Sequence, residues 1–253
     1  MTAPLLTLGI AFGACTLLWL VSLRIADVSI IDIFWAPGFA LLAWAAALAS
    51  PPIGPRGWVV LALASLWGLR LGLHILLRHH GEDHRYGAMR TKFGARWWWW
   101  SLFQVFWLQA LLLWIISWPL QVAVAAPAPW SLLDCLGTTL AAAGLVIEGL
   151  ADWQLTRFRN DASNKGKVMD QGLWSWSRHP NYFGDALMWW GYFLIGFAGS
   201  HAWWLLLSPA LMTILLLRVS GVSLMEEDIA DRRPGYAEYI RRTSAFVPWP
   251  PQR

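Results

Sequence analysis

Charged residues are scarce in this sequence. Asp, Glu, Lys and Arg make up 13% of the 253 residues, whereas 57% are hydrophobic. A soluble globular domain has about twice that share of charge, so an ordinary soluble domain and a disordered chain are excluded. Seven apolar runs approach the span length of about 20 residues, at 4–23, 33–50, 58–77, 101–124, 130–152, 182–199 and 202–221. We therefore predict an all-α bundle of seven transmembrane helices forming a single domain, 1–253.

Cysteine and the familiar nucleotide-binding motifs are also lacking. Cys15 and Cys135 are the two cysteines and both lie in predicted spans, which argues against a disulfide scaffold and a thiolate metal site. We expect no metal. The sequence has no Gly-rich dinucleotide fingerprint, no P-loop, no zinc-protease helix motif and no nucleophile elbow. If a nucleotide binds, the helices of the bundle must hold it.

The basic residues fall almost entirely on one side of the predicted membrane. Of the 19 Lys and Arg, 17 lie in or at the edge of the segments near 24–32, 78–100, 153–181 and 222–253. Cytoplasmic loops carry such an excess, so we expect the N-terminus outside and the C-terminus in the cytoplasm. The excess then reports topology, and no nucleic acid is expected as a partner.

Ionisable residues in the first half of the chain provide candidate catalytic groups. Arg70 lies within the 58–77 run on one helical face with Trp67 and His74, buried or snorkelling. Glu82 and Tyr86 follow in a polar loop that could also be simply solvated. Asp32 would enter the membrane edge, where a neutral carboxyl group could donate a hydrogen bond to a carbonyl oxygen. The neighbouring Asp27 and Ser29 could instead be helix caps.

The 130–152 run ends in a charged helical face. Glu148, Asp152 and Arg159 lie within about 40° of one another on a helical wheel. They could hydrogen-bond a ribose or an amide, with Arg157 and Arg159 facing phosphate. They could equally form an internally neutralised cluster that only packs the helix end.

The segment 172–185 is the most specific motif. Pro180 predicts a helix start, whose free N–H groups favour an anion such as a diphosphate. Arg178 and His179 precede it, and Asn181 and Asp185 follow on one face. The alternative is a loop-to-helix junction without a ligand. The tail beyond Glu226 is too polar to span and should form a helix and a cap over the site.

The run Trp97–Trp100 lies where a charged loop meets an apolar span. An interfacial aromatic belt explains it, and a stacking platform for a flat ligand is the alternative.

Together these segments resemble the membrane steroid 5α-reductase family, and most closely its bacterial branch of uncharacterised proteins. The resemblance rests on Asp27–Phe39, Trp67–Arg70, Glu82–Tyr86, Ala151–Gln154, Gly172–Asp185 and Glu226–Pro248. It implies a seven-helix reductase that uses NADPH to reduce the carbon–carbon double bond of an enone lipid. It also implies a bacterial inner-membrane location and a cofactor site facing the cytoplasm, in about 130–253. The implied cofactor contacts are Asp152, Arg157, Arg159, Trp174, Arg178, His179, Asn181, Tyr182, Asp185 and Glu226.

The proton donor departs from the family pattern. The steroid enzymes of that family use a tyrosine of the third span, but 58–77 contains none. Tyr86 is the nearest candidate acid. The predicted catalytic set is therefore Asp32, Arg70, Glu82 and Tyr86, with a hydrophobic small molecule or membrane lipid as the substrate.

Two other functions remain open at this stage. Membrane methyltransferases of isoprenylated cysteine or phospholipid amines also carry Arg-His-Pro-x-Tyr-x-Gly before a helix, and they would use S-adenosylmethionine. A lipid-binding scaffold without activity is the third possibility, disfavoured by the charge on inward helix faces. The oligomeric state is not predicted.

Overall fold

The computed structural model describes residues 3–219 and 235–251. By the contacts among its residues, the chain divides into two compact units, and the single domain stays a prediction. Unit 1 comprises Met1–Ser131 and Ile195–Leu205, and unit 2 comprises Leu132–Leu194 and Leu206–Arg253. All the regular structure within the described ranges is helical, in agreement with the predicted all-α class.

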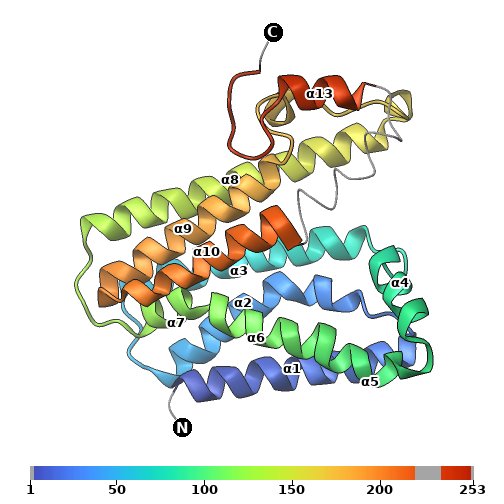
Figure 1. Ribbon diagram of the computed structural model, residues 1–253. Coiled ribbons are helices and arrows are strands. Elements are labelled where there is room, and N and C mark those ends of the chain that lie inside the picture. Colours follow the sequence, from blue (N-terminus) through green and yellow to red (C-terminus); the bar gives the residue numbers. More distant parts are fainter. Residues whose placement is uncertain (1–2, 220–234, 252–253) are drawn as a thin grey trace. The chain divides into compact units, whose positions relative to one another are not determined.

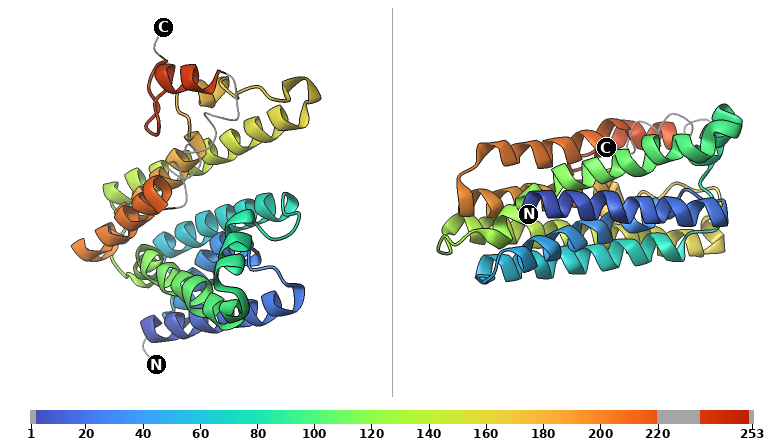
Figure 2. Two further views of the ribbon diagram at one scale, coloured as in Figure 1. Left: turned by 45° about the vertical axis from the view of Figure 1, so that its right-hand side comes forward. Right: turned by 90° about the horizontal axis from the view of Figure 1, so that it is seen from below.

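Unit 1 is a bundle of apolar helices that run side by side (Figures 1 and 2). It contains α1 (Ala3–Ile25), α2 (Ile30–Ala49), α3 (Pro55–Leu77), α4 (His84–Phe93), α5 (Trp97–Ser101), a π-helical stretch (Leu102–Trp107), α6 (Leu108–Ile116) and α7 (Trp118–Ala125). The short helices α4 and α5 lie at the end where α1 and α3 finish (Figure 1). The polar loops 26–29 and 78–83 therefore meet at that end.

Small residues let α2 and α3 approach closely. A Cβ on Gly68 would lie 3.0 Å from the Ala36 carbonyl oxygen, and one on Gly72 would lie 2.8 Å from Pro37. Contacts this close leave no room for larger side chains. Phe39 and Trp67 are fully buried beside this contact, with their rings 5.7 Å apart. This packing fixes the start of α2, where Asp32 lies.

The predicted run 101–124 is divided in the structure. α6 ends at Ile116, and α7 begins at Trp118 with Pro119 in its first turn. Proline lacks the N–H of a continuing helix, so a break before it has a local cause.

Unit 2 is built around two long helices. It contains α8 (Leu132–Asn160), short 3₁₀ turns at Ala162–Asn164 and Gly172–Ser175, the larger part of α9 (Pro180–Ser200), α10 (Leu207–Ile214), a π-helical stretch (Leu215–Val219) and α13 (Tyr236–Arg242). α8 and α9 are in close contact at two glycines, because a Cβ on Gly144 would lie 2.4 Å from the Gly184 carbonyl oxygen. The predicted helix start at Pro180 and the predicted helix in the tail are both present.

Five helices are long and apolar enough to cross a membrane, consistent with an integral membrane protein. They are Ala3–Ile25, Ile30–Ala49, Pro55–Leu77, His84–Ile116 and Leu132–Asn160. The last two predicted spans, 182–199 and 202–221, fall on α9 and on the shorter apolar helix Trp203–Arg218. Seven spans and the orientation of the termini remain predictions.

Candidate functional site

Asp32, Tyr86 and Arg85 meet at the polar end of unit 1. The Tyr86 hydroxyl donates a hydrogen bond to Asp32 Oδ1 over 2.8 Å, and Arg85 Nη2 donates to Asp32 Oδ2 over 3.1 Å. Asp32 is in the first turn of α2, and the other two are in α4. Tyr86 is buried, whereas the side chains of Asp32 and Arg85 are 28% and 40% exposed. We call these three residues the Asp32 cluster; a ligand can reach its acid and its guanidinium.

The accepting role of Asp32 differs from the expected donating one. Both of its oxygens accept hydrogen bonds in this arrangement, one of them from a guanidinium. A guanidinium can only donate, and the Tyr86 hydroxyl is placed to donate as well. Tyr86 and Arg85 are therefore the donors of this cluster.

A helix cap positions Arg85 and Tyr86 in their helix. Asp83 is the N-cap of α4, and its Oδ1 accepts from the Arg85 backbone N–H and from Arg85 Nε, both over 2.9 Å. Partial burial raises the pKa of Asp83, but these hydrogen bonds outweigh burial and hold that pKa below its usual value. The cap therefore orders the start of α4 and orients the Arg85 guanidinium.

Glu82 connects the loop 78–83 to α4 and to the loop 26–29. Its carboxylate accepts from Arg90 Nη2 over 2.7 Å and Arg90 Nε over 2.9 Å, and from the Val28 N–H over 3.1 Å. Arg90 Nη2 also donates to the Ala26 carbonyl oxygen. These contacts hold Glu82 in place between Arg90 and the loop 26–29, and its catalytic role stays a prediction.

A second buried network joins the loops 26–29 and 78–83. Asp27 Oδ2 lies 2.7 Å from His79 Nε2, and Asp27 Oδ1 accepts from the Ser29 N–H and hydroxyl. The Ser29 hydroxyl accepts from the Asp83 N–H over 2.9 Å. The Ser29 side chain makes no cap hydrogen bond to α2, so it ties the two loops together and does not cap the helix.

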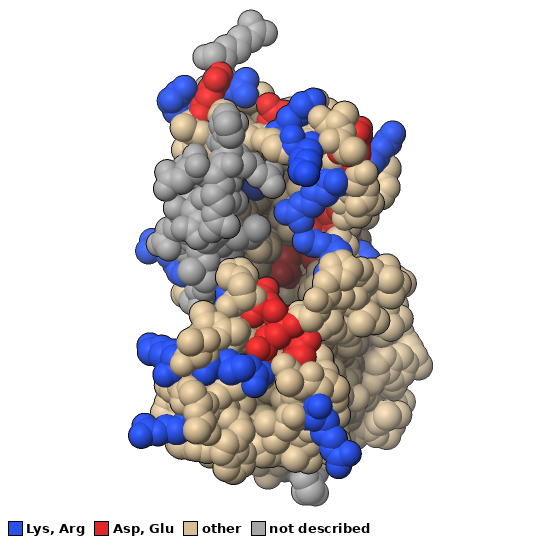
Figure 3. Space-filling model, turned by 90° about the vertical axis from the view of Figure 1, so that its right-hand side faces the viewer, with Lys and Arg blue, Asp and Glu red and all other residues tan. Residues whose placement is uncertain are grey.

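The face of unit 1 that carries these residues is mixed in charge. In the lower half of Figure 3, acidic side chains form a red patch bordered by blue basic ones.

Arg70 lies further along α3, half-buried, with Nε and Nη2 shielded from solvent. That burial agrees with the buried alternative for Arg70. On the same helix, Arg78 Nη1 lies 3.1 Å from His74 Nε2.

Unit 2 holds a separate cluster between α8 and α9. Asn181 Nδ2 donates to Asp152 Oδ1 over 3.2 Å, which joins two of the predicted cofactor contacts. Glu148, Asp185 and Tyr192 are also buried there. We call these five residues the Asp152 cluster. The buried Asn181 Oδ1 has no hydrogen-bond partner within the described residues, so it is an acceptor available to a ligand.

Trp174 and Arg178 hold the tail. Trp174 Nε1 donates to the Ala151 carbonyl oxygen over 3.1 Å, and its own carbonyl oxygen accepts from the Tyr239 hydroxyl over 2.6 Å. Arg178 Nη1 donates to the carbonyl oxygens of Ile240 and Thr243, at the end of α13. The buried Arg178 thus satisfies the last carbonyl groups of that helix. The implied contact of Arg178 with a cofactor stays a prediction.

The remaining predicted contacts are dispersed. Arg157 and Arg159 are exposed at the end of α8, and the Arg157 guanidinium lies 5.6 Å from the Trp153 ring centroid. His179 stacks on Tyr182 with ring centroids 5.6 Å apart. Glu226 lies outside the described residues. No group of three His, Cys, Asp or Glu side chains in the described part of the chain is arranged to hold a metal ion.

Sequence reasoning missed Arg85, Asp83 and the Asp27–His79 contact. Their common signal was the density of ionisable residues in 79–85, directly after an apolar span. Such a run costs little in a solvated loop, so the sequence by itself gave no reason to pair it with α2.

Together the fold and these buried polar clusters define an all-helical integral membrane protein. Residues 18–243 match the family model described as protein of unknown function (DUF1295), so the chain belongs to this family. It is 24% identical over 269 residues to the uncharacterised protein C594.04c of Schizosaccharomyces pombe. That alignment covers 94% of this chain and 78% of the yeast protein. No solved structure matches.

Proposed function

We propose that the protein is a membrane reductase that uses NADPH to reduce the carbon–carbon double bond of an enone lipid. The observation that carries this proposal is the Tyr86 hydroxyl, held at 2.8 Å from Asp32 beside the Arg85 guanidinium. A hydroxyl and a guanidinium at the end of an apolar bundle suit the carbonyl oxygen of a lipid. The likeness of the DUF1295 family to steroid 5α-reductases supports the same reaction.

The Asp32 cluster fits the charge that this reaction develops. When bound, NADPH supplies a hydride to the carbon β to the carbonyl group. The double-bond electrons then move toward the carbonyl oxygen, where Tyr86 can donate a hydrogen bond in exchange for its bond to Asp32. Arg85 keeps the Asp32 carboxylate paired during that exchange. Water supplies the proton that adds to the α carbon and completes the reduction. Each donor to the oxygen contributes about 2.7–4 kcal/mol.

The Asp152 cluster fits a nicotinamide better than a metal or a phosphate. The carboxamide N–H₂ of a nicotinamide is a donor, and Asn181 Oδ1 is a buried acceptor within the cluster. Asp152 orients that amide through the Asn181 Nδ2 contact. The exposed Arg157 and Arg159 would provide positive charge for phosphates, including a 2′-phosphate.

Ligand-induced thermal stabilisation of the purified full-length protein tests the cofactor. A ligand at 100 times its Kd stabilises the folded state by about 2.7 kcal/mol. We expect NADPH to raise Tm, and Asn181→Ala to lose this rise. The matched control is Asn160→Ala, at the exposed end of α8, which should keep it. A rise in Tm with S-adenosylmethionine alone would replace the reductase by a methyltransferase.

A further inference from the structure

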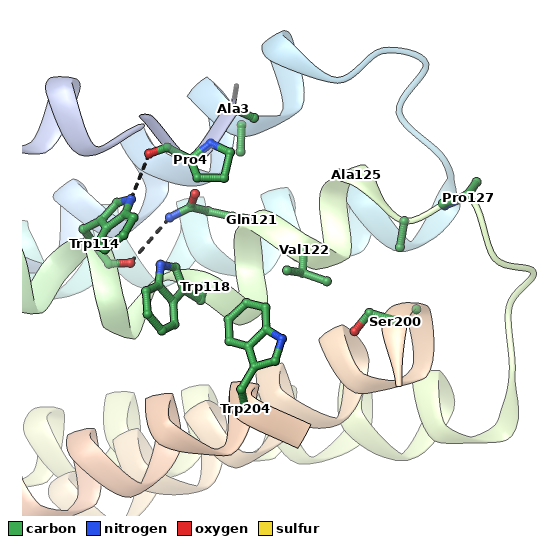
Figure 4. Close-up of a pocket in the computed structure, with 13 residues that line it drawn as sticks. Ala3, Pro4, Trp114, Trp118, Gln121, Val122, Ala125, Pro127, Ser200 and Trp204 are labelled. Carbon is green, nitrogen blue, oxygen red and sulfur yellow. Dashed lines mark hydrogen bonds between the residues drawn. The ribbon is translucent and has the colours of Figure 1, made fainter. Parts of the chain in front are cut away.

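A cavity of about 770 Å³ lies at the opposite end of unit 1 from the Asp32 cluster. Its walls come from the start of α1, the end of α2, α7 and the segment 199–204. Figure 4 shows Pro4, Trp114, Trp118, Gln121, Val122 and Trp204 around it. Along α2, Asp32 and the lining residue Ala46 are about 21 Å apart. This cavity is therefore distinct from the acid group of the proposed reaction.

The Gln121 amide, the Trp114 N–H and the Ser200 hydroxyl of the wall are already hydrogen-bonded within the protein. Gln121 Oε1 accepts from the Thr7 hydroxyl over 2.8 Å, and Gln121 Nε2 donates to the Ser117 hydroxyl over 2.7 Å. Trp114 Nε1 donates to the Pro4 carbonyl oxygen (Figure 4). The Ser200 hydroxyl donates to the Gly196 carbonyl oxygen. The lining residues carry no charge. A ligand of this cavity would be recognised through apolar contact.

Three tryptophans give the cavity a rigid aromatic wall. Trp118 packs edge-to-face against Trp114 and against Trp204, with ring centroids 5.1 Å apart in both pairs. Such pairs are worth about 0.5–1.5 kcal/mol beyond their burial, so the wall is formed before a ligand arrives. A preformed wall lowers the cost of ordering on binding.

The surroundings determine what fills this space. Ala125, Pro127 and Trp204 are exposed, so the cavity opens at the surface of unit 1. Its walls include the ends of α1 and α2, which are both long and apolar enough to span a membrane. Most of the lining is apolar, so the cavity suits hydrocarbon better than water. The volume is within the range of about 300–1,000 Å³ of small-molecule sites.

We propose that this cavity binds one acyl chain of a membrane phospholipid. The site is separate from the Asp32 cluster, so it is a structural or regulatory lipid site that does not depend on the proposed reaction. The chain enters past Trp204 and lies against Trp118 and Val122.

Photocrosslinking in a bilayer tests this site without any measurement of turnover. The full-length protein is reconstituted in phosphatidylcholine nanodiscs that contain a phosphatidylcholine with a diazirine at the end of one acyl chain. After irradiation, labelled peptides are identified by mass spectrometry. We expect label concentrated on residues 114–127 and 199–204. Val122→Phe and Ala125→Phe, which fill the cavity, should each lower this label by roughly tenfold.

Val21→Phe is the matched control, because Val21 is exposed on the membrane helix α1 outside the cavity. It should leave the label unchanged. Label spread evenly over the exposed apolar helices, and insensitive to both cavity-filling variants, would overturn the proposal. Displacement of the label by the enone 4-cholesten-3-one, but not by excess unlabelled phosphatidylcholine, would also overturn it and assign the cavity to an enone lipid.

Discussion

Tyr86 has one hydroxyl proton, and that proton points at Asp32. In the proposed reaction the same hydroxyl donates its hydrogen bond to a carbonyl oxygen, so removal of the hydroxyl should affect turnover more than cofactor binding. For Tyr86→Phe we expect kcat for NADPH oxidation with an enone lipid to fall by about 10²–10³-fold. The NADPH-induced rise in Tm should persist.

Tyr239→Phe is the matched control for this prediction. The Tyr239 side chain is buried too, but its hydroxyl donates to the Trp174 carbonyl oxygen. Tyr239 is not part of the Asp32 cluster. Turnover in this variant should change much less than in Tyr86→Phe. Equal turnover in Tyr86→Phe and the unmodified protein would remove Tyr86 from the mechanism.

Asp83 links the pH dependence of stability to the geometry of Arg85. Its pKa in the folded state lies below the usual value because of the Arg85 hydrogen bonds. The stability that Asp83 contributes is therefore fully present above its unfolded pKa, about 3.9, and is lost as pH falls through the folded value. Asp83→Ala also removes the N-cap, which should cost about 1 kcal/mol.

Thermal unfolding at several pH values checks the Asp83 prediction. The difference in Tm between Asp83→Ala and the unmodified protein should be constant near neutral pH and shrink as pH falls below about 4. Asp161→Ala is compared with Asp83→Ala, because Asp161 also accepts from a backbone N–H, that of Ser163, but does so in an exposed 3₁₀ turn. A pH-independent difference for Asp83→Ala would show that the charge on Asp83 adds nothing to the cap.

The residues of the candidate site could be predicted from the sequence better than the contacts between them. Asp32 stood out because an ionisable group at the edge of an apolar span is costly, and Glu82 and Tyr86 stood out as ionisable residues of the loop after an apolar span. Their pairing depends on how the 78–83 loop returns to the start of α2, which follows from long-range contacts such as Ser29 with Asp83. The hydrogen bonds of Arg178 could not be predicted either, because the sequence does not show that α13 ends beside it.

Among the elements, α8 and α9 have the most demanding contact. A Cβ on Gly184 would lie 2.6 Å from the Glu148 backbone nitrogen and 2.7 Å from the Gly144 carbonyl oxygen. Backbone atoms cannot yield as a flexible side chain can, so Gly184→Ala must separate the two helices. We expect a loss of about 1–3 kcal/mol of stability, although alanine favours helix by about 1 kcal/mol.

Gly87→Ala is the matched control for this contact. Gly87 is also in a helix, α4, but a Cβ there would meet nothing within 4 Å. This variant should leave Tm unchanged or raise it, whereas Gly184→Ala should lower it. An unchanged Tm in Gly184→Ala would mean that α8 and α9 are not in this close contact in the membrane protein.

Helices could be predicted well where length and hydrophobicity alone decide them. Five of the seven predicted spans overlap helices that could cross a membrane, and one of the five, 101–124, is only partly covered. The break at Ser117 was missed, although Pro119 marks it, because a long apolar run dominates the pattern. The helix α13 was expected from polarity and turn residues, but its partners Trp174 and Arg178 belong to tertiary structure that no local pattern encodes.

At the scale of the whole molecule, the distribution of Lys and Arg predicts which segments lie on each side of the membrane. Helix α3 of unit 1 allows this topology to be tested. Arg56, at the start of α3, donates to the carbonyl oxygens of Ala128 and Pro129. Helix α3 then runs for about 34 Å before the loop that leads into α4. That length exceeds the hydrocarbon thickness of about 30 Å, so residues near 128 and residues in α4 should lie on opposite sides of the membrane.

Cysteine labelling decides the orientation of these two sides. In a Cys135→Ser background, which removes the exposed cysteine and leaves the buried Cys15, we expect Ala128→Cys to react with a membrane-impermeant maleimide added outside intact cells. Ala88→Cys, exposed on α4, should react only after permeabilisation. The reverse pattern would invert the topology and place the Asp32 cluster outside, where NADPH is absent, so it would also argue against the proposed reductase. Reaction of both cysteines from outside would mean that α3 does not cross the bilayer at all.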